Sequence, residues 1–410
     1  MRVIGNTLTA RLLLQDLLAN EVAVEWYGPP EAPAALALDL TLLPGPTLSL
    51  AQHSRNRWQA LAQELPFPVL NSLTMLDLAT TPGRAVKLRE EALLDALAGE
   101  PCEYLDTTPS GFHPRLVQGA RRLAPAPQVA ETLWADLTAQ LAAAGVPLQP
   151  LPTEADEAWL LNAPTTLTDM ALAARWLPQL YLQPLRVHRL QWPLPQPLPL
   201  PEAPLLAVHR MPRGHTWLHL TAQQLTLWYD GLNDPRQRTA EAAADDATVV
   251  ALAQHAAQVL PLLGRLAAPT PAVAQATTVF VLADGLPLVG PLAVDSPLWL
   301  LGGMGVREAL YAPALVERLL ELWRVEECVQ SPLLPARFAH VGPQALRVPE
   351  SLMFTEPTPA APAEPTVVRP AAQMAPETEV KRATEVRMVG KEVVSGGGTM
   401  LLAKPDKAKP

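Results

Sequence analysis

Residues 1–30, MRVIGNTLTARLLLQDLLANEVAVEWYGPP, decide the fold class of this chain. The short apolar run at 1–4 predicts a strand, and the leucines of residues 8–18 recur at the three- and four-residue spacing of a helix. Residues 22–24, Val-Ala-Val, predict a second strand, which Gly28-Pro29-Pro30 ends. Strand, tight turn, helix and strand within thirty residues are typical of the start of a parallel βαβ sheet, so the sequence predicts an α/β fold.

The turn itself, Gly5-Asn6-Thr7-Leu8-Thr9-Ala10, carries part of a dinucleotide-binding signature. Gly5 meets the first glycine position and Ala10 is tolerated at the third, but Thr7 stands at the second, where a side chain would intrude on the phosphates. Glu25 lies at the offset expected for the acid that binds ribose hydroxyls. Gly5, Thr7, Ala10 and Glu25 are therefore candidate cofactor-binding residues. A βαβ opening without a ligand explains this motif equally well.

A second set of motifs lies near the C-terminus. It consists of VLADGLPLVGPL at 281–292, LWLLGGMGVREALYAPALVERLLELW at 298–323 and SPLLPARFAH at 331–340. The order D-G-L-P, G-P, glycine-rich turn, A-P and R-F resembles the closing third of the FAD-dependent D-amino-acid oxidase/glycine oxidase superfamily. Residues 305–313 are similar to the G-S-R-G-L-x-x-A-P turn of the oxidase domain in the bifunctional tRNA methylaminomethyl-uridine enzymes. The chain thus resembles a divergent member of that superfamily.

This resemblance implies a Rossmann-type FAD domain and hydride transfer from an amine-bearing carbon to the flavin. FAD would be the cofactor and an amine or amino acid the substrate. The resemblance implies that Gly302, Gly303, Gly305 and Val306 direct backbone N–H groups toward the flavin ring. Two residues become candidates for substrate positioning, namely Arg307 for a carboxylate and Tyr229 as an aromatic wall.

Two departures from the family pattern leave three functions open. The strand expected after the helix near 128–144 is cut to residues 146–151, and Pro164 stands where the family tends to have glycine. The leading interpretation is an FAD-dependent oxidoreductase acting on an amine or amino acid. The second is a flavin-free pseudoenzyme of the same fold that acts as a scaffold or partner subunit. The third is an oxidase-type domain in tRNA wobble-uridine modification.

The domain organisation follows from changes in pattern along the chain. Alternating apolar residues predict an inserted antiparallel β-sheet substrate domain (α+β) at 179–263, and residues 1–178 and 264–345 then form the FAD-binding-like domain. The Pro-, Ala- and Thr-rich segment 346–410 predicts a flexible, disordered tail, either inert or holding a docking peptide for a protein partner.

The local patterns of the first domain predict three further elements. Residues 114–123 and 128–144 read as helices, because their apolar residues recur at helical spacing. The continuous apolar run at 159–163 predicts a buried parallel strand.

Composition narrows the function classes. The net charge of −9 and the pI near 5.5 argue against a nucleic-acid-binding face. The two cysteines match no metal or disulfide pattern, so a reducing, cytoplasmic location is expected. No stretch reaches the roughly 18 apolar residues of a membrane span. His215 and His219 have no cysteine nearby, and no metal site is predicted.

Overall fold

The computed structural model describes most of the chain up to residue 335. The described residues are 1–29, 48–97, 99–130, 132–151, 160, 162–177, 180, 182–194, 196, 204–211, 214–231, 246–261, 263–266, 270–282, 284–293, 296–324 and 333–335. All of them fall in one compact unit, Met1–Thr355. The predicted tail, residues 346–410, lies outside the described residues, as do Arg337 and Phe338.

A six-stranded sheet holds the predicted βαβ opening. Its order is β13-β14-β7-β1-β2-β6, and every pair is parallel except β13 with β14. Its strands are β1 (Arg2–Ile4), β2 (Glu25–Tyr27), β6 (Leu148–Gln149), β7 (Thr165–Leu167), β13 (Leu288–Pro291) and β14 (Leu298–Gly302). The expected shortening of the strand at 146–151 is confirmed, since β6 has only two residues.

Helices cover both faces of this sheet. One face packs on α1 (Leu8–Ala19), α2 (Leu48–Glu64), α4 (Leu133–Ala143) and α9 (Glu308–Arg324), whose buried leucines form the largest core cluster. The other face packs on α6 (Met170–Trp176). Val3 belongs to the first of these cores and Ile4 to the second, because successive side chains of a strand point to opposite faces of the sheet. The Rossmann-type α/β layer is therefore confirmed.

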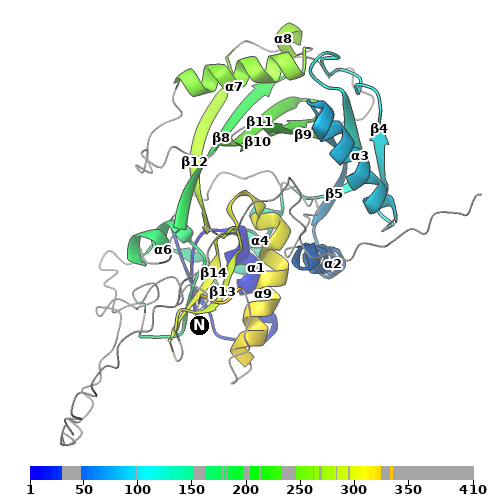
Figure 1. The fold of residues 1–410 in the computed structure, drawn as a ribbon. Coiled ribbons are helices and arrows are strands. Elements are labelled where there is room, and N and C mark those ends of the chain that lie inside the picture. The colour runs from blue at the N-terminus through cyan, green and yellow to red at the C-terminus, as the bar shows by residue number, and fades with distance from the viewer. Residues whose placement is uncertain are drawn as a thin grey trace, which may run out of the picture. The chain divides into compact units, whose positions relative to one another are not determined.

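A second, eight-stranded sheet has the order β12-β8-β11-β10-β9-β3-β5-β4. Its pairs are antiparallel except the parallel pair β3–β9. Figure 1 shows α7 (Asp246–Val259) and α8 (Leu263–Leu266) along one face. The strands are β3 (Leu70–Ala79), β4 (Cys102–Leu105), β5 (Gly119–Val129), β8 (Leu182–Pro193), β9 (Leu205–Met211), β10 (Gly214–Leu220), β11 (Gln224–Gly231) and β12 (Val273–Leu282).

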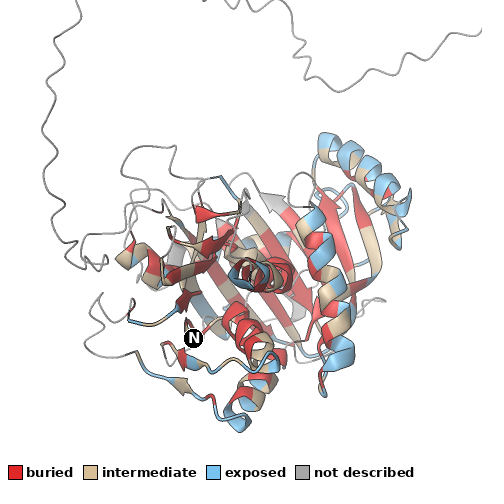
Figure 2. Ribbon diagram, turned by 90° about the horizontal axis from the view of Figure 1, so that it is seen from below, coloured by how far each residue is buried: buried red, intermediate tan, exposed pale blue. Residues whose placement is uncertain are grey.

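The two faces of this larger sheet carry different clusters. Leu218 and Leu227 belong to the cluster under α7, which we call the α7 face. Trp217 and Trp228, one residue removed on the same paired strands, belong to a separate cluster on the opposite face, which we call the inner face. Figure 2 shows that buried residues gather on the strands, whereas the helices carry exposed residues on their outer sides.

Three predicted elements are wrong in position or type. The second strand is Glu25–Tyr27 rather than 22–24, because Glu21 takes a positive φ of 58° after α1 and the chain pairs with β1 only from Glu25 onward. Of the parallel strand predicted at 159–163, residues 159 and 161 lie outside the described residues and the other three are not in a strand; the parallel strand is β7, Thr165–Leu167. Most of residues 114–123 lie in a turn and in β5, because β3 and β4 supply hydrogen-bonding partners that outweigh the helical spacing.

The larger sheet also draws on more of the chain than one insertion. Strands β3, β4 and β5, between residues 70 and 129, join it, and so does β12, which pairs with β8 along its whole length. The boundaries at 179 and 263 stay a prediction, because sheet membership does not test which segments fold as a unit. Among the described residues, no helix has both the length and the apolar character needed to cross a bilayer.

Candidate functional site: the turn between β1 and α1

The turn after β1 is built around Gly5 and Thr7. Gly5 has a φ of 141°, and a Cβ on it would lie 2.2 Å from Thr168 Oγ1, so no side chain fits there. Thr7 is the N-cap of α1, where its hydroxyl accepts a hydrogen bond from the Ala10 backbone N–H at 3.1 Å. This cap satisfies one of the free amides at the start of the helix.

A second amide of this helix start is satisfied by a residue 299 positions away. Glu308, the first residue of α9, places Oε1 2.8 Å from the Thr9 backbone nitrogen and 2.7 Å from the Thr9 hydroxyl. Burial raises the pKa of the Glu308 carboxyl, while the Thr9 donors and the charge of Arg11 oppose that shift. The N-terminus of α1, where a dinucleotide fold binds diphosphate, thus faces a carboxylate of the chain itself.

Arg11 holds the same turn from inside α1. Its side chain is buried and donates to Thr7 O at 2.9 Å, to Asn6 Oδ1 at 2.6 Å and to the Thr138 hydroxyl at 2.8 Å. Its guanidinium lies 4.9 Å from the Trp26 ring centroid and 4.2 Å from the Trp134 ring centroid. Such distances allow cation–π attraction to both rings.

The carboxyl end of β2 also closes over the turn. The buried Asn6 side chain donates to Pro29 O at 3.0 Å, and the Trp26 indole donates to Gly5 O at 2.8 Å. A Cβ on Gly28 would lie 3.1 Å from the Asn6 nitrogen. The described residues at this end of β2, up to Pro29, include no carboxylate.

Glu25 is not brought to the turn. It begins β2 and pairs with Arg2, whereas Gly5 follows the far end of β1. Its carboxylate accepts from Arg2 Nε at 3.0 Å and is half-exposed. Because ligands of parallel sheets bind beyond the carboxyl ends of the strands, Glu25 stands at the opposite edge from a ribose.

The glycine run after β14 is packed against side chains of the chain. A Cβ on Gly302 would lie 2.7 Å from Met170 Cε, and one on Gly303 would lie 2.1 Å from Leu282 Cδ1. Gly305 is equally close to Val281, with 2.5 Å to its Cγ1. These glycines let β14 and the following turn approach β12 and α6.

The two substrate-positioning candidates come from different elements, Tyr229 from β11 and Arg307 from the 3-10 turn η2. Val306 and Arg307 belong to the 3-10 turn η2 (Gly305–Arg307), and Val306 packs against the inner face. Tyr229 packs against the α7 face, beside His188. Its neighbour Trp228 is the aromatic residue that lies on the inner face. Tyr229 and Val306, the neighbour of Arg307, therefore pack on opposite faces of the larger sheet.

Glu308 was missed by reasoning from the sequence. The signal was present, because the family pattern G-S-R-G-L-x-x-A-P, placed on Gly305 to Pro313, has glycine where this chain has Glu308. Two positions that are small in the family pattern, at Thr7 and Glu308, thus carry larger polar side chains here. Only the fold shows that both side chains point to the same helix start.

Comparison with solved structures identifies the fold. Glycine oxidase from Geobacillus kaustophilus matches with a TM-score of 0.65 at 20% sequence identity, covering 82% of this chain and 98% of that one. L-proline dehydrogenase from P. horikoshii matches with a TM-score of 0.64 at 13% identity, covering 83% and 97%. Iminodiacetate oxidase from Chelativorans sp. BNC1 matches with a TM-score of 0.61 at 14% identity, covering 81% and 97%.

These neighbours define the class. The chain has the fold of the amino-acid and amine oxidoreductases, and the resemblance seen in its sequence is confirmed at the level of the fold. The low identities mark it as a divergent example. No protein-family model matches the sequence, and no curated protein matches it either.

The residues around the turn do not fit the FAD that this fold implies. A diphosphate needs free amides at the start of α1 and a glycine-lined approach to them. Here the Thr9 amide is bonded to Glu308, the Ala10 amide is bonded to Thr7, and Glu25 is at the other edge of the sheet. Among the described residues, no group of three His, Cys, Asp or Glu side chains is arranged to hold a metal ion.

Proposed function

We propose that this protein keeps the glycine oxidase fold as a non-catalytic scaffold or partner subunit and does not use FAD. The observation that supports this proposal is the Glu308 carboxylate on the amide and hydroxyl of Thr9. In this view the negative group at the start of α1 is supplied by the chain. The amide groups and the dipole at the start of α1 then interact with Glu308 rather than with a bound ligand.

The two occupants compete for the same donor, because the Thr9 amide that would face a phosphate already donates to Glu308. Binding a diphosphate at this turn therefore requires Glu308 to leave, and its departure breaks two hydrogen bonds to Thr9. The Thr7 side chain adds bulk at the position where the backbone must approach the pyrophosphate.

The alternative is an FAD-dependent oxidoreductase acting on an amine or amino acid. It is favoured by the extent of the structural match, which reaches 98% of glycine oxidase and includes the large sheet over the first domain. In that alternative Arg307 keeps its predicted role toward a substrate carboxylate, and Glu308 turns away from Thr9 when the cofactor binds.

Cofactor content separates the two functions. The full-length protein is purified, its absorbance is recorded at about 370 and 450 nm, where oxidised flavin absorbs, and it is titrated with FAD while flavin fluorescence is followed. We expect a colourless protein with no saturable FAD binding. A yellow protein with one FAD per chain, or saturable binding by the unmodified chain, overturns the proposal.

A gain-of-binding variant tests the stated cause. The double change Thr7→Gly and Glu308→Gly reopens the helix start, and we expect it to bind FAD measurably. Its matched control joins Thr7→Gly to Glu321→Gly, a glycine at an exposed acid of the same helix whose partner is Arg318. We expect the control to resemble the unmodified chain. If the control gains FAD binding as well, Glu308 is not the residue that excludes the cofactor.

A further inference from the structure

A threonine and two histidines form a hydrogen-bonded series under α7, outside the turn between β1 and α1. His209 Nε2 lies 3.1 Å from Thr80 Oγ1, and His209 Nδ1 lies 3.0 Å from His255 Nε2. Both distances are within the range of hydrogen bonds. We call these three residues the Thr80 triad.

The pairing of β3 with β9 brings the first two members together. These strands are parallel, and His209 stands opposite Leu78. Leu78 belongs to the cluster on the α7 face, and Thr80 follows two residues later, so it extends toward that same face. Helix α7 packs there and contributes His255. The triad thus joins residues that are 129 and 46 positions apart in the sequence.

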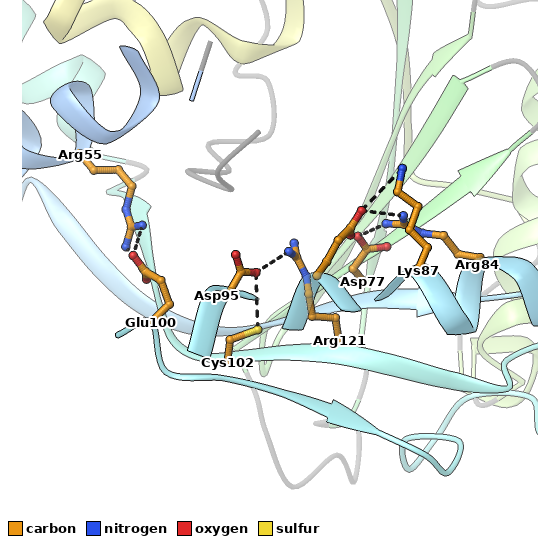
Figure 3. Close-up of polar contacts among 9 residues, drawn as sticks. Arg55, Asp77, Arg84, Lys87, Asp95, Glu100, Cys102 and Arg121 are labelled. Atoms are coloured by element: carbon orange, nitrogen blue, oxygen red, sulfur yellow. Dashed lines mark hydrogen bonds and ion pairs between the residues drawn. The ribbon is translucent and has the colours of Figure 1, made fainter. Parts of the chain in front are cut away.

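The turn that carries Thr80 is held on both sides. Helix α3 (Pro82–Leu97) begins two residues after it. Arg84 of α3 donates to Asp77 of β3 at 2.5 Å, so one ion pair spans the turn, as Figure 3 shows. The Thr81 hydroxyl accepts from the Arg84 backbone N–H at 3.2 Å, as a helix cap does. These contacts fix the turn and leave the Thr80 hydroxyl to the triad.

The Thr80 hydroxyl lies at the edge of the solvent. Thr80 is half-buried, and Thr81, Pro82 and Gly83 after it are exposed. No described atom lies within 4 Å of the place that a Cβ on Gly83 would take. His209 is buried, with only 8% exposure. A small molecule can therefore approach Thr80 from the start of α3, while the imidazole behind it is shielded from water.

The Thr80 triad has the arrangement of an activated nucleophile, namely a hydroxyl, an imidazole base and a third group that orients the base. When His209 carries its proton on Nδ1, it donates to His255, and its Nε2 is free to accept the Thr80 proton. The distance of 3.1 Å lies within the roughly 2.6 to 3.2 Å that such a proton transfer needs. Burial, and then the charge of His255, lower the pKa of His209 to about 4, so the ring is unprotonated at neutral pH.

We propose that Thr80 is a modification site that accepts one acyl group from an activated carboxylic ester or thioester. The Thr80 oxygen attacks the acyl carbon while His209 Nε2 takes the hydroxyl proton. The bond from that carbon to the leaving oxygen or sulfur then breaks, and His209 gives its proton to the leaving group. The products are an ester on Thr80 and a free alcohol or thiol, so the step needs no oxidant and no further reactant.

The surroundings of Thr80 favour an uncharged acyl group over a phosphate. Arg84, the cation nearest to it in the sequence, is engaged by Asp77 and Glu91. On the other side lies the apolar cluster of the α7 face, to which Leu78 belongs. A transferring phosphate needs cations at its site, whereas an acyl group needs an apolar contact and the hydroxyl.

The proposal does not depend on whether FAD binds, because no residue of the Thr80 triad belongs to the turn between β1 and α1. A single transfer per chain is also compatible with a subunit that has no turnover of its own. FAD binding and Thr80 acylation are measured separately, so either can fail without the other.

Acetylation by p-nitrophenyl acetate tests the site. The full-length protein is mixed with the ester, p-nitrophenol release is followed by absorbance, and the acetyl group is located by peptide mass spectrometry. We expect acetyl at Thr80, approaching one per chain. Thr80→Val, which keeps the shape and removes the hydroxyl, should lose it, whereas Thr80→Ser should keep it. Thr81→Asn is the matched control, since it removes the adjacent hydroxyl and keeps a capping side chain, and it should react like the unmodified chain. An unmodified chain without acetyl at Thr80 overturns the proposal.

Variants of the two histidines test the roles within the triad. His209→Gln should slow acetylation of Thr80 by about 100-fold or more, because the general base is lost. His255→Leu removes the acceptor for the Nδ1 proton and should also slow it. His255→Gln, whose amide oxygen can accept that proton, should restore most of the rate. Acetylation of Thr80 at an unchanged rate in His209→Gln overturns the proposal.

The pH dependence of the rate identifies the base. His255 faces His209 from α7, and Thr80 faces it from the end of β3. Because the pKa of His209 is lowered to about 4, the acetylation rate should be nearly constant from about pH 7 to about pH 5. A loss of rate centred near pH 6.5, the ordinary value of a histidine, would assign the base to a residue outside the triad and overturn the proposal.

Discussion

Glu308 and Thr9, 299 positions apart in the sequence, are joined by two hydrogen bonds at the start of α1. Oε1 of Glu308 accepts from the Thr9 backbone N–H at 2.8 Å and from its hydroxyl at 2.7 Å. The contact links the first and last helices of the six-stranded layer, α1 and α9, through one carboxylate.

Glu308→Ala should reduce the free energy of unfolding by about 1 to 3 kcal/mol, because it leaves the Thr9 amide without its acceptor. Glu308→Gln keeps an acceptor oxygen and should lose less. Urea unfolding followed by tryptophan fluorescence measures both. Glu321→Ala, an exposed position on the same helix, should change stability by a few tenths of a kcal/mol. Equal values for Ala and Gln at residue 308 would show that the hydrogen bonds do not stabilise the fold.

Arg11→Met should destabilise the protein by about 3 to 5 kcal/mol, since it removes a buried cation with three hydrogen bonds and leaves Glu308 uncompensated. Arg11→Lys should not restore stability, because an ammonium cannot stack between Trp26 and Trp134 as the planar guanidinium does. Thermal unfolding compares the variants with Arg318→Met, an exposed pair whose loss should cost below about 1 kcal/mol. Full rescue by lysine contradicts the stacking argument.

A pair of stacked histidines joins β9 to α7. His209 Nδ1 lies 3.0 Å from His255 Nε2, and the two rings stack at 5.0 Å. Burial, and then the neighbouring His255, lower the pKa of His209 to about 4, and burial also lowers the pKa of His255. A free histidine binds its proton near pH 6.5, so between that pH and about 4 the unfolded chain binds more protons than the folded one.

Stability should therefore fall as pH decreases from about 6.5 to 4, by up to roughly 1.4 kcal/mol per pH unit for each proton. Denaturant unfolding at a series of pH values measures the slope. His255→Gln removes one titrating ring while keeping hydrogen-bonding groups, and its slope should be smaller. An unchanged slope in that variant would assign the pH dependence to other groups.

Much of the fold could be predicted from the sequence because its decisive patterns are local. The strand–turn–helix at residues 1–18 and the helix near 312–325 each bury one face, and that periodicity is visible along the chain. Local pattern failed at residues 114–123, most of which lie in a turn and in β5, because pairing with β3 and β4 outweighs the helical spacing of the apolar residues. It also misplaced the strand at 165–167, which is too short to have a period of its own.

The candidate site was predicted in part. Gly5 and Thr7 lie in the turn and Ala10 in the first turn of α1, since all three belong to a single strand–helix unit. The ribose-binding role predicted for Glu25 depends on which end of β2 it occupies, and the aromatic-wall role predicted for Tyr229 depends on which face of β11 it occupies. Because β2 begins at Glu25, this residue lies at the end of the sheet away from the turn. Because side chains alternate along β11, Tyr229 lies on the α7 face. Residue spacing alone predicts neither the strand start nor the face.

The sequence by itself determined the class of fold, through a βαβ opening and an ordered set of motifs at the other end of the chain. Only the tertiary structure decided what meets the start of α1. Packing of α9 on α1 brings Glu308 to Thr9, and packing of α3 on the sheet buries Leu88 while leaving Leu93, Leu94 and Leu97 in solvent. Both depend on contacts between segments distant in sequence, whereas residue periodicity reports only which side of an element is buried.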